Sequence, residues 1–298
     1  MAISFAPPGF TGSPLTRVDN ERDNQAYHDE QLARADAKFL RLNGLAPEVS
    51  DDGRIGWGPV SEAAPDATLA LLGLIDGTPH FVPIDPVQEN GAQRSAAMSA
   101  ALGQLQPTEA ATYAIARCLI DWHSRHQFCP RCGKHTRPMR SGWARLCDKA
   151  TEGCGSEHFP RTDPVVIMLA EYDGKILVGR QKPWPERNYS ALAGFVEVGE
   201  SIEEAVAREL FEEAGVKATK VRYIASQPWP FPSQLMIACI AEVESPQLNL
   251  DSKEIEAAIW ADKDEVALAL KRDDAAPFMP PPPFAIANTL LTRWAAGA

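Results

Sequence analysis

Three glutamates in the segment GFVEVGESIEEAVARELFEEAGV stand at a spacing that would bring their carboxylates together. Ser201 with a glutamate three residues later is a capping-box pattern, and Gly215 is a typical residue just beyond a helix end. We therefore expect a helix between them. On that helix Glu209, Glu212 and Glu213 stand at i, i+3 and i+4, so all three side chains project from one face.

This carboxylate face predicts a divalent cation and a phosphate substrate. Three like charges so close repel one another unless a cation lies among them. Hard oxygen ligands favour Mg²⁺ or Mn²⁺, and Mg²⁺ is commonly held by carboxylates together with substrate phosphates. The metal would neutralise a diphosphate and activate the attacking water, while a remaining carboxylate takes its proton. The alternative is a solvated glutamate-rich helix face without a ligand.

Four of the six cysteines fall within a short span and predict a metal site of another kind. They are Cys129, Cys132, Cys147 and Cys154. The first pair is a C-x2-C knuckle, whereas six residues separate the second pair, which therefore needs a longer loop. Four thiolates would close the coordination of one structural Zn²⁺ per chain. Four reduced thiols are the alternative, and His135 and His158 are substitute ligands that the cysteines make unnecessary.

Composition sets limits on the class of protein. The 298 residues suggest about two domains, and 45% hydrophobic content is ample for packed cores. A net charge of −11 provides no basic surface for non-specific nucleic-acid binding. No stretch reaches the roughly 18 apolar residues of a membrane span, and the start MAISFAPPGF lacks signal-peptide features. We expect a cytoplasmic protein without membrane contact.

The elements that must position these residues can be outlined from local patterns. Two hairpins are expected around Asp76-Gly77 and Asp173-Gly174, and an amphipathic helix over 108–127 leads into the cysteines. Further strands are expected in VRYIASQ, LMIACIAEV and AAIWA. Two more helices are expected over 262–270 and 284–294. Strands alternating with helices in the second half indicate an α/β unit.

The glutamate segment resembles the Nudix box, the signature of the Nudix hydrolases. The box positions G-x5-E-x7-R-E-U-x-E-E-x-G-U, with U apolar, are all met here. The resemblance implies that Glu209 and Glu213 are metal ligands and that Glu212, which lies between them, belongs to the same metal site. It also implies an orienting salt bridge from Arg208 and a supporting role for Glu200. Of the three catalytic glutamates we expect Glu213 to matter most.

A second motif, SQPWPFP at residues 226–232, narrows the substrate. Three prolines pre-order the chain, and a rigid Trp or Phe can stack on a nucleotide ring. Taken alone, such a cluster could equally be a packed loop. It resembles the signature of the NADH pyrophosphatases within the Nudix hydrolases. In that family the motif usually ends in PFPQS, whereas this chain has Ser233-Gln234 in place of the final Gln-Ser pair.

The same resemblance implies further roles for single residues. It puts Phe159 and Phe195 near the nucleotide and Trp229 where relatives reach across a dimer interface. It assigns Gln227, Ser233 and Gln234 to substrate contact. It makes Glu254 a further metal ligand, with Glu256 as the alternative. Backbone contacts to metal and substrate are implied at Ala193 and Ala287.

Together these observations predict an α/β (α+β) chain with a Nudix α/β/α sandwich and a mixed sheet. The expected domains are an N-terminal Nudix-like α+β domain (1–124), a zinc ribbon (125–160) and the Nudix domain (161–298). The expected activity is hydrolysis of NADH or NAD⁺ to AMP and nicotinamide mononucleotide. The family resemblance also implies a homodimer. Removal of NAD caps from RNA by the same site is a further expectation. Alternatives are a hydrolase of ADP-ribose or dinucleoside polyphosphates, or a zinc-ribbon binding module with a vestigial Nudix fold.

Overall fold

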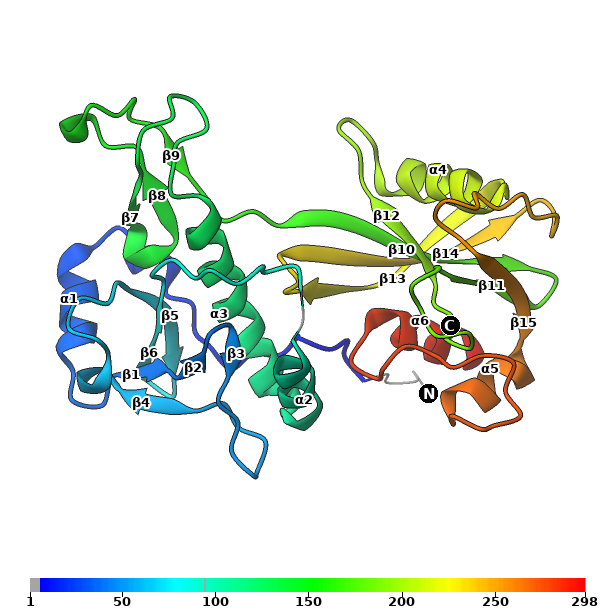
Figure 1. Cartoon of the computed structure of the whole chain (residues 1–298), viewed down its shortest axis with the longest axis horizontal. Coiled ribbons are helices and arrows are strands. Elements are labelled where there is room, and N and C mark those ends of the chain that lie inside the picture. Colours follow the sequence, from blue (N-terminus) through cyan, green and yellow to red (C-terminus); the bar gives the residue numbers. More distant parts are fainter. Residues whose placement is uncertain (1–5, 94, 298) are drawn as a thin grey trace. The chain divides into compact units, whose positions relative to one another are not determined.

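The chain forms two units that interleave along the sequence (Figure 1). A computed structural model describes residues 6–93 and 95–297, so the first five residues of the start segment lie outside the described part. We call residues 6–9, 163–228 and 234–297 the C-terminal unit, and residues 10–162 with 229–233 the N-terminal unit. Among the described residues, no helix combines the length and the hydropathy needed to cross a bilayer.

A six-stranded mixed sheet forms the centre of the C-terminal unit. The strand order is β13-β14-β10-β11-β15, and β12 also pairs with β10. Strand β10 runs parallel to β14 and antiparallel to β11 and β12. The strands are β10 (Asp163–Tyr172), β11 (Lys175–Arg180), β12 (Leu192–Phe195), β13 (Ala218–Trp229), β14 (Gln234–Val243) and β15 (Ala257–Asp262).

Helices cover both faces of this sheet (Figure 1). Along β10, Val166 and Met168 pack with α4 (Ile202–Ala214), whereas Ile167 and Leu169 join the opposite core. That opposite core contains α5 (Lys263–Leu270) and α6 (Ile286–Ala295). Successive strand residues point to opposite faces, so a strand buried on both sides is apolar throughout. The predicted α/β/α sandwich with a mixed sheet is confirmed, and the predicted strands and helices of this unit all form.

A four-stranded sheet and three helices make up most of the N-terminal unit. The strand order is β4-β1-β6-β5, and β2 pairs with β3 separately. The predicted hairpin around Asp76-Gly77 is β5/β6, and both turn residues have positive φ angles of 49° and 78°. The elements are α1 (Gln25–Ala33), β1 (Lys38–Leu40), β2 (Leu42–Asn43), β3 (Ala46–Pro47), β4 (Trp57–Pro59), β5 (Leu69–Ile75), β6 (Thr78–Pro83), α2 (Ala96–Gln104) and α3 (Pro107–Arg125).

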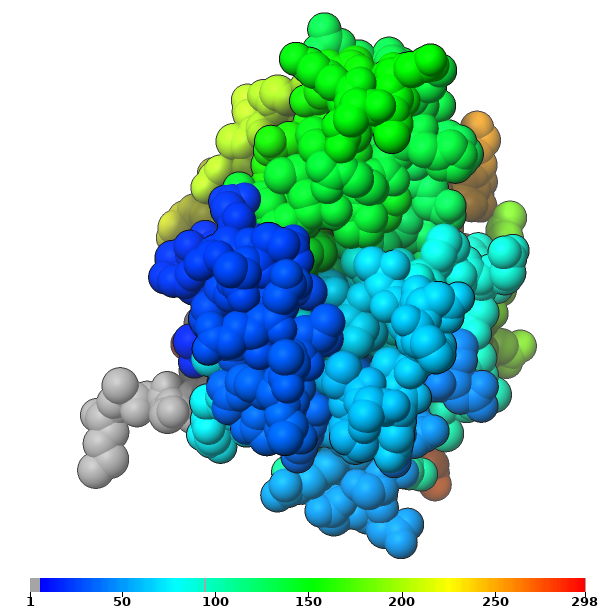
Figure 2. Space-filling view, turned by 90° about the vertical axis from the view of Figure 1, so that its left-hand side faces the viewer, coloured from blue at the N-terminus to red at the C-terminus, as the bar shows by residue number. Residues whose placement is uncertain are grey.

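The cysteine module follows α3 as a small sheet of order β7-β8-β9. Its strands are β7 (Arg137–Met139), β8 (Ala144–Leu146) and β9 (Glu157–His158). In the space-filling view its green surface continues into the blue and cyan segments before it (Figure 2). The indole of Trp143 donates to the carbonyl oxygen of Leu71 in β5 at 2.7 Å, which ties the module to the preceding sheet. The division of this unit near residue 124 stays a prediction.

Candidate active site

Helix α4 begins and ends where its sequence predicts. The Ser201 hydroxyl accepts a hydrogen bond from the Glu204 amide at 3.2 Å, and the Glu204 carboxylate accepts one from the Ser201 amide at 2.7 Å. Gly215 ends the helix in the left-handed region with φ 73°. Because local hydrogen bonds fix both ends of the helix, the residues of the box themselves determine which face of the helix carries the three glutamates.

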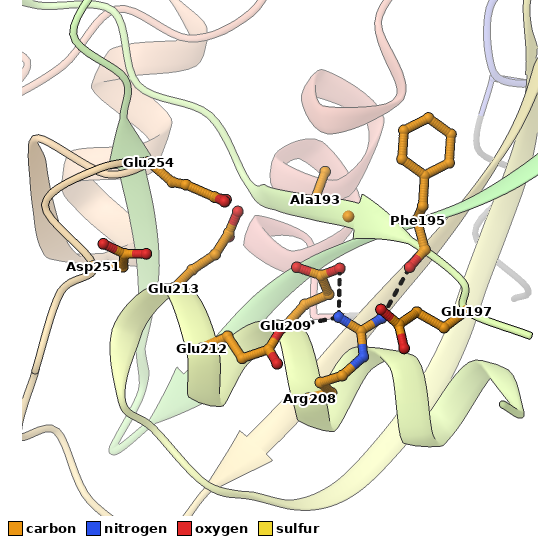
Figure 3. Close-up of a pocket in the computed structure, with 10 residues that line it drawn as sticks. Ala193, Phe195, Glu197, Arg208, Glu209, Glu212, Glu213, Asp251 and Glu254 are labelled. Atoms are coloured by element: carbon orange, nitrogen blue, oxygen red, sulfur yellow. Dashed lines mark hydrogen bonds and ion pairs between the residues drawn. The ribbon is translucent and has the colours of Figure 1, made fainter.

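The three glutamates line one cavity of about 630 Å³ in the C-terminal unit (Figure 3). Strand β12 forms a second wall, and the segment before β15 forms a third. The lining residues are Ala193, Gly194, Phe195, Glu197, Arg208, Glu209, Glu212, Glu213, Asp251 and Glu254. The cavity is strongly acidic, with six carboxylates and one guanidinium among its ten residues.

Arg208 organises one side of this cavity. Its Nε and Nη2 donate to the two carboxylate oxygens of Glu200 at 2.7 and 2.9 Å. Nη1 donates to Glu209 at 2.8 Å and to Glu212 at 3.0 Å, and Nη2 also donates to the carbonyl oxygen of Phe195 at 2.9 Å. This bonding lowers the pKa of Glu200 to about 2. Arg208 therefore holds three glutamates and the end of β12 in one arrangement.

Glu213 lies deeper and has no such partner. It is 4% exposed, and its Oε2 has no hydrogen-bond partner among the described residues. Burial, and then the charges of Glu209, Glu254 and Glu212, raise its pKa to about 8. Burial also raises the pKa of Glu209, against the opposing effect of Arg208. A buried carboxylate oxygen without a donor, facing other carboxylates, fits a divalent cation with oxygen ligands.

Strand β12 approaches the glutamates closely at Gly194. A Cβ at this position would lie 1.8 Å from Oε1 of Glu209, so only glycine leaves room for that carboxylate. Ala193, the residue implied to supply a backbone ligand, precedes it on the same strand and lines the cavity. Glycine at the first position of the box therefore has a steric cause.

The structure separates Glu254 from its alternative. Glu254 lines the cavity and faces Glu213 in the close-up (Figure 3). Glu256 instead forms an ion pair with Arg180 at 2.7 Å. Of the two, Glu254 is the one that lies among the carboxylates of the cavity.

Two cavity residues, Asp251 and Glu197, were not expected from the sequence. The Asp251 amide donates to the carbonyl oxygen of Glu213 at 3.0 Å, and its carboxylate accepts from the Lys253 amide at 2.9 Å. Its position three residues before Glu254, in a turn, is the signal that could have found it. Glu197 lies in the loop between β12 and α4 and carries no comparable local signal.

The SQPWPFP residues have different environments. Gln227 is fully buried, and its amide donates to the carbonyl oxygens of Gly9 at 2.8 Å and Phe284 at 2.7 Å. Its Oε1 accepts from the Ile286 amide at 2.7 Å, so these bonds anchor the end of β13 to the start of α6. Substrate contact by this side chain stays a prediction.

The remaining implied substrate residues fall in both units. Ala287 is buried in α6, Gln234 begins β14, and Phe195 is 53% exposed at the end of β12. Trp229 and Ser233 belong to the N-terminal unit, as does Phe159, which is 54% exposed. Two exposed aromatic rings are thus available for stacking.

The four predicted zinc ligands come together. Their sulfur atoms all lie within 4.8 Å of one another, with Cys129 and Cys154 at 3.6 Å and Cys132 and Cys147 at 3.4 Å. His135 and His158 are outside the group. The wide second spacing is taken up by a 3₁₀ turn at Lys149–Thr151. After this turn, the Gly155 amide donates a hydrogen bond to the carbonyl oxygen of Cys147 at 2.8 Å. The cluster fits one Zn²⁺ with a closed, structural coordination.

Comparison with known proteins agrees with this geometry. Residues 160–281 match the family model described as the NUDIX domain, and residues 124–159 match the NADH pyrophosphatase zinc ribbon domain. The protein named NAD-capped RNA hydrolase NudC from Mycobacterium bovis is 34% identical, over 95% of this chain and 94% of its own length. The fold and the site thus define a Nudix domain with a zinc ribbon.

The chain belongs to the Nudix hydrolase family, among the members that carry the NADH pyrophosphatase zinc ribbon. The protein named NAD-capped RNA hydrolase NUDT12 from Homo sapiens is 46% identical over 86% of this chain and 54% of its own length. The mouse protein named NAD(P)H pyrophosphatase NUDT13, mitochondrial, is 40% identical over 65% of this chain and 57% of its own. The chain therefore spans about half the length of these two relatives.

Proposed function

We propose that this chain hydrolyses the pyrophosphate bond of NADH or NAD⁺, giving AMP and nicotinamide mononucleotide. The observation that carries the proposal is the buried Oε2 of Glu213, which has no hydrogen-bond partner among the described residues, in a cavity with Glu209, Glu212 and Glu254. Three of the four come from one helix face and the fourth from the segment before β15. This arrangement supports a site for Mg²⁺ or Mn²⁺ rather than for a softer ion.

The protein's own residues would divide the work as follows. Glu209, Glu213 and Glu254 would hold the metal, which when bound neutralises the diphosphate and activates water. Arg208 keeps Glu209 and Glu212 oriented through its bonds at 2.8 and 3.0 Å. A carboxylate outside the coordination takes the proton of the water as it attacks phosphorus. Of the three helix glutamates Glu212 is the most exposed, with 58% of its side chain exposed, which suits that exchange of protons with solvent.

The nucleotide half would be held by aromatic stacking. Phe195 stands at the cavity on β12, and its exposed ring supports contact with a base or nicotinamide ring. Roles for Phe159, Trp229, Ser233, Gln234 and the Ala193 and Ala287 backbones are part of the same proposal.

We also propose a homodimer in which Trp229 reaches the partner's nucleotide. A monomer by light scattering at working concentration would contradict the dimer. A cytoplasmic location stays a prediction.

Removal of an NAD cap from RNA is a second candidate function. The observation that favours it is that two relatives covering most of this chain are named NAD-capped RNA hydrolases. A cap presents the same dinucleotide to the same cavity. Because the chain's net charge is −11, we expect such RNA to be bound at its end rather than along its backbone.

The deciding experiment is a product analysis with several candidate substrates. Pure protein with Mg²⁺ or Mn²⁺ is incubated with NADH, ADP-ribose, diadenosine polyphosphates and NAD-capped RNA in ¹⁸O-labelled water. The expected result is equal amounts of AMP and reduced nicotinamide mononucleotide from NADH, with one ¹⁸O label on phosphate. Absence of AMP from NADH would refute the main proposal, and cleavage of ADP-ribose alone would favour the alternative hydrolase. Failure to cleave any of these substrates would favour the binding module.

A further inference from the structure

Arg117, in the N-terminal unit, is a fully buried arginine in the middle of α3. Its Nη2 donates to the backbone carbonyl oxygens of Gly91 at 2.9 Å and Gln93 at 3.3 Å. Its Nε and Nη1 have no hydrogen-bond partner within the described ranges 6–93 and 95–297. A buried charged donor left unpaired is costly, so its presence requires an explanation.

The guanidinium lies against the SQPWPFP loop. Its central carbon stands 4.7 Å from the ring centroid of Phe231, over the ring face. The next residue of the helix, Cys118, points its sulfur at the carbonyl oxygen of Pro232 at 3.7 Å. Two successive residues of α3 thus support two successive residues of the loop.

Phe231 in turn packs against Trp229. The two rings meet edge to face with centroids 5.4 Å apart. Phe10 contacts both of them edge-on, at 5.8 Å from Trp229 and 6.3 Å from Phe231. Phe10 and Phe231 are buried, whereas Trp229 is only half-buried. Arg117 therefore packs beneath an aromatic cluster of Phe10, Phe231 and Trp229, of which Trp229 is the most exposed member.

The plane of the guanidinium is set by its backbone partners. Gly91 comes so close to α3 that a Cβ there would lie 1.6 Å from Oδ1 of Asp121. Asp121 stands four residues after Arg117, on the same helix face. Glycine at position 91 thus allows its carbonyl to reach Nη2. A lysine at position 117 could not accept this arrangement, because its ammonium is not planar and does not stack.

We propose that Arg117 is a positioning residue for substrate recognition: stacked under Phe231, it fixes the orientation in which Trp229 is presented to the nucleotide. The proposal rests on the proposed function in one respect, the contact of Trp229 with substrate. Arg117 itself touches neither substrate nor the glutamates, which belong to the other unit. Its loss should therefore weaken binding while leaving the chemical step alone.

The kinetic test compares two Arg→Lys variants in the full-length protein. Arg117→Lys is expected to raise KM for NADH roughly five- to tenfold, with kcat within twofold, because part of a stacking contact is lost. Arg22→Lys is the matched control, since Arg22 lies 3.8 Å over the Trp143 ring in the same unit but away from the loop. Its KM should stay at the wild-type value. An unchanged KM in folded Arg117→Lys, or an equal rise in Arg22→Lys, would overturn the proposal.

A second readout is independent of any activity. Protein labelled with 5-fluorotryptophan gives ¹⁹F resonances, and Trp229→Phe identifies the one from Trp229. Arg117→Lys should shift or broaden that resonance, whereas Arg22→Lys should affect the Trp143 resonance instead. If the chain does not cleave NADH, this measurement still tests the positioning role. Should Arg117→Lys fail to fold, Phe231→Leu removes the stacked ring from the other side, and an unmoved Trp229 resonance in it would refute the proposal.

Discussion

At the scale of single residues, the site is governed by how each glutamate is paired. Arg208 binds Glu200 through two bonds and also donates to Glu209 and Glu212, so these three carboxylates are held in a fixed orientation. Glu213 has no such donor, and its buried oxygen lacks any partner among residues 6–93 and 95–297. The unpaired group is the one that a cation would satisfy.

Replacing Glu213 by glutamine should therefore disable the metal site while keeping the fold. The side chain keeps its size, but an amide cannot supply the charge that holds the metal. We expect kcat for NADH with Mg²⁺ to fall by about 10² to 10⁴, with an unchanged circular dichroism spectrum. Glu256→Gln is the control, because Glu256 pairs with Arg180 outside the cavity lining, and its kcat should stay within twofold. Near-normal turnover of Glu213→Gln would remove this residue from the mechanism.

At the scale of elements, the site depends on how closely β12 passes α4. The antiparallel pairing of β12 with β10 places Gly194 opposite Val166 and beside the Glu209 carboxylate. A strand at this distance would allow backbone and carboxylate oxygens to bind one cation. The closeness is possible only without a side chain at this point.

Gly194→Ala should accordingly impair the cation site. Its Cβ would stand 1.8 Å from Oε1 of Glu209, so that carboxylate must move away from the position in which it accepts from Arg208. We expect weaker Mn²⁺ binding by calorimetry and at least tenfold lower activity. Gly103→Ala is the control, because it lies in α2 with nothing within 4 Å of the new Cβ. That change should leave metal binding intact and stabilise the fold by about 0.5–1 kcal/mol. Equal Mn²⁺ affinity in both variants would contradict the steric argument.

The joint between α3 and the ribbon contains a buried histidine. His123 is fully buried; its Nε2 donates to the carbonyl oxygen of Gly142, and its Nδ1 accepts from Nη1 of Arg145, both at 2.8 Å. Burial, opposed by the bond to Gly142 and assisted by the charges of Arg145 and His126, lowers its pKa to about 4. The neutral ring is thus built into the packing of the ribbon against α3.

This histidine makes the N-terminal unit sensitive to mild acid. Below about pH 6.5 this histidine becomes protonated in the unfolded chain, whereas in the folded protein it stays neutral until about pH 4. The free energy of unfolding therefore falls as the pH falls through this window. From this group we expect an average loss of about 1 kcal/mol per pH unit between pH 6.5 and 5, approaching about 1.4 kcal/mol per unit at the acid end. His123→Gln keeps a donor and an acceptor but does not titrate, so its urea unfolding should show a correspondingly smaller pH slope. Equal slopes for the two proteins would show that His123 is not responsible.

At the scale of the whole molecule, the two candidate metal sites belong to different units. The cysteine cluster is in the N-terminal unit and the carboxylate cavity in the C-terminal unit. The ribbon strands have two or three residues each, too short to be stable without a cross-link. The C-terminal unit has a buried core on both faces of its sheet and needs no such support.

Zinc removal should thus have a local effect. The purified protein should contain about one zinc ion per chain that withstands dialysis but is released by thiol-modifying reagents. After release, hydrogen exchange should lose protection in β7, β8 and β9, while β10 and β14 keep theirs. The untreated protein with zinc retained is the control. Zinc-free protein with protected ribbon strands would refute a structural role for the metal.

The sequence by itself determined the parts whose signals are local. The capping box, the phase of the three glutamates, the hairpin turns and the set of four cysteines all depend on spacing along the chain, and they form as expected. Even the wide Cys147 to Cys154 interval only required one extra turn.

Only the tertiary structure decided the contacts between distant segments. It brought Glu254 to the glutamates while pairing Glu256 with Arg180, and it added Asp251 and Glu197 to the cavity. It also enclosed Gln227 among backbone groups more than fifty residues away. These outcomes depend on how sheets and helices pack. Glu254 and Glu256 lie two residues apart in the same segment, and nothing in the local sequence shows which of them faces the cavity.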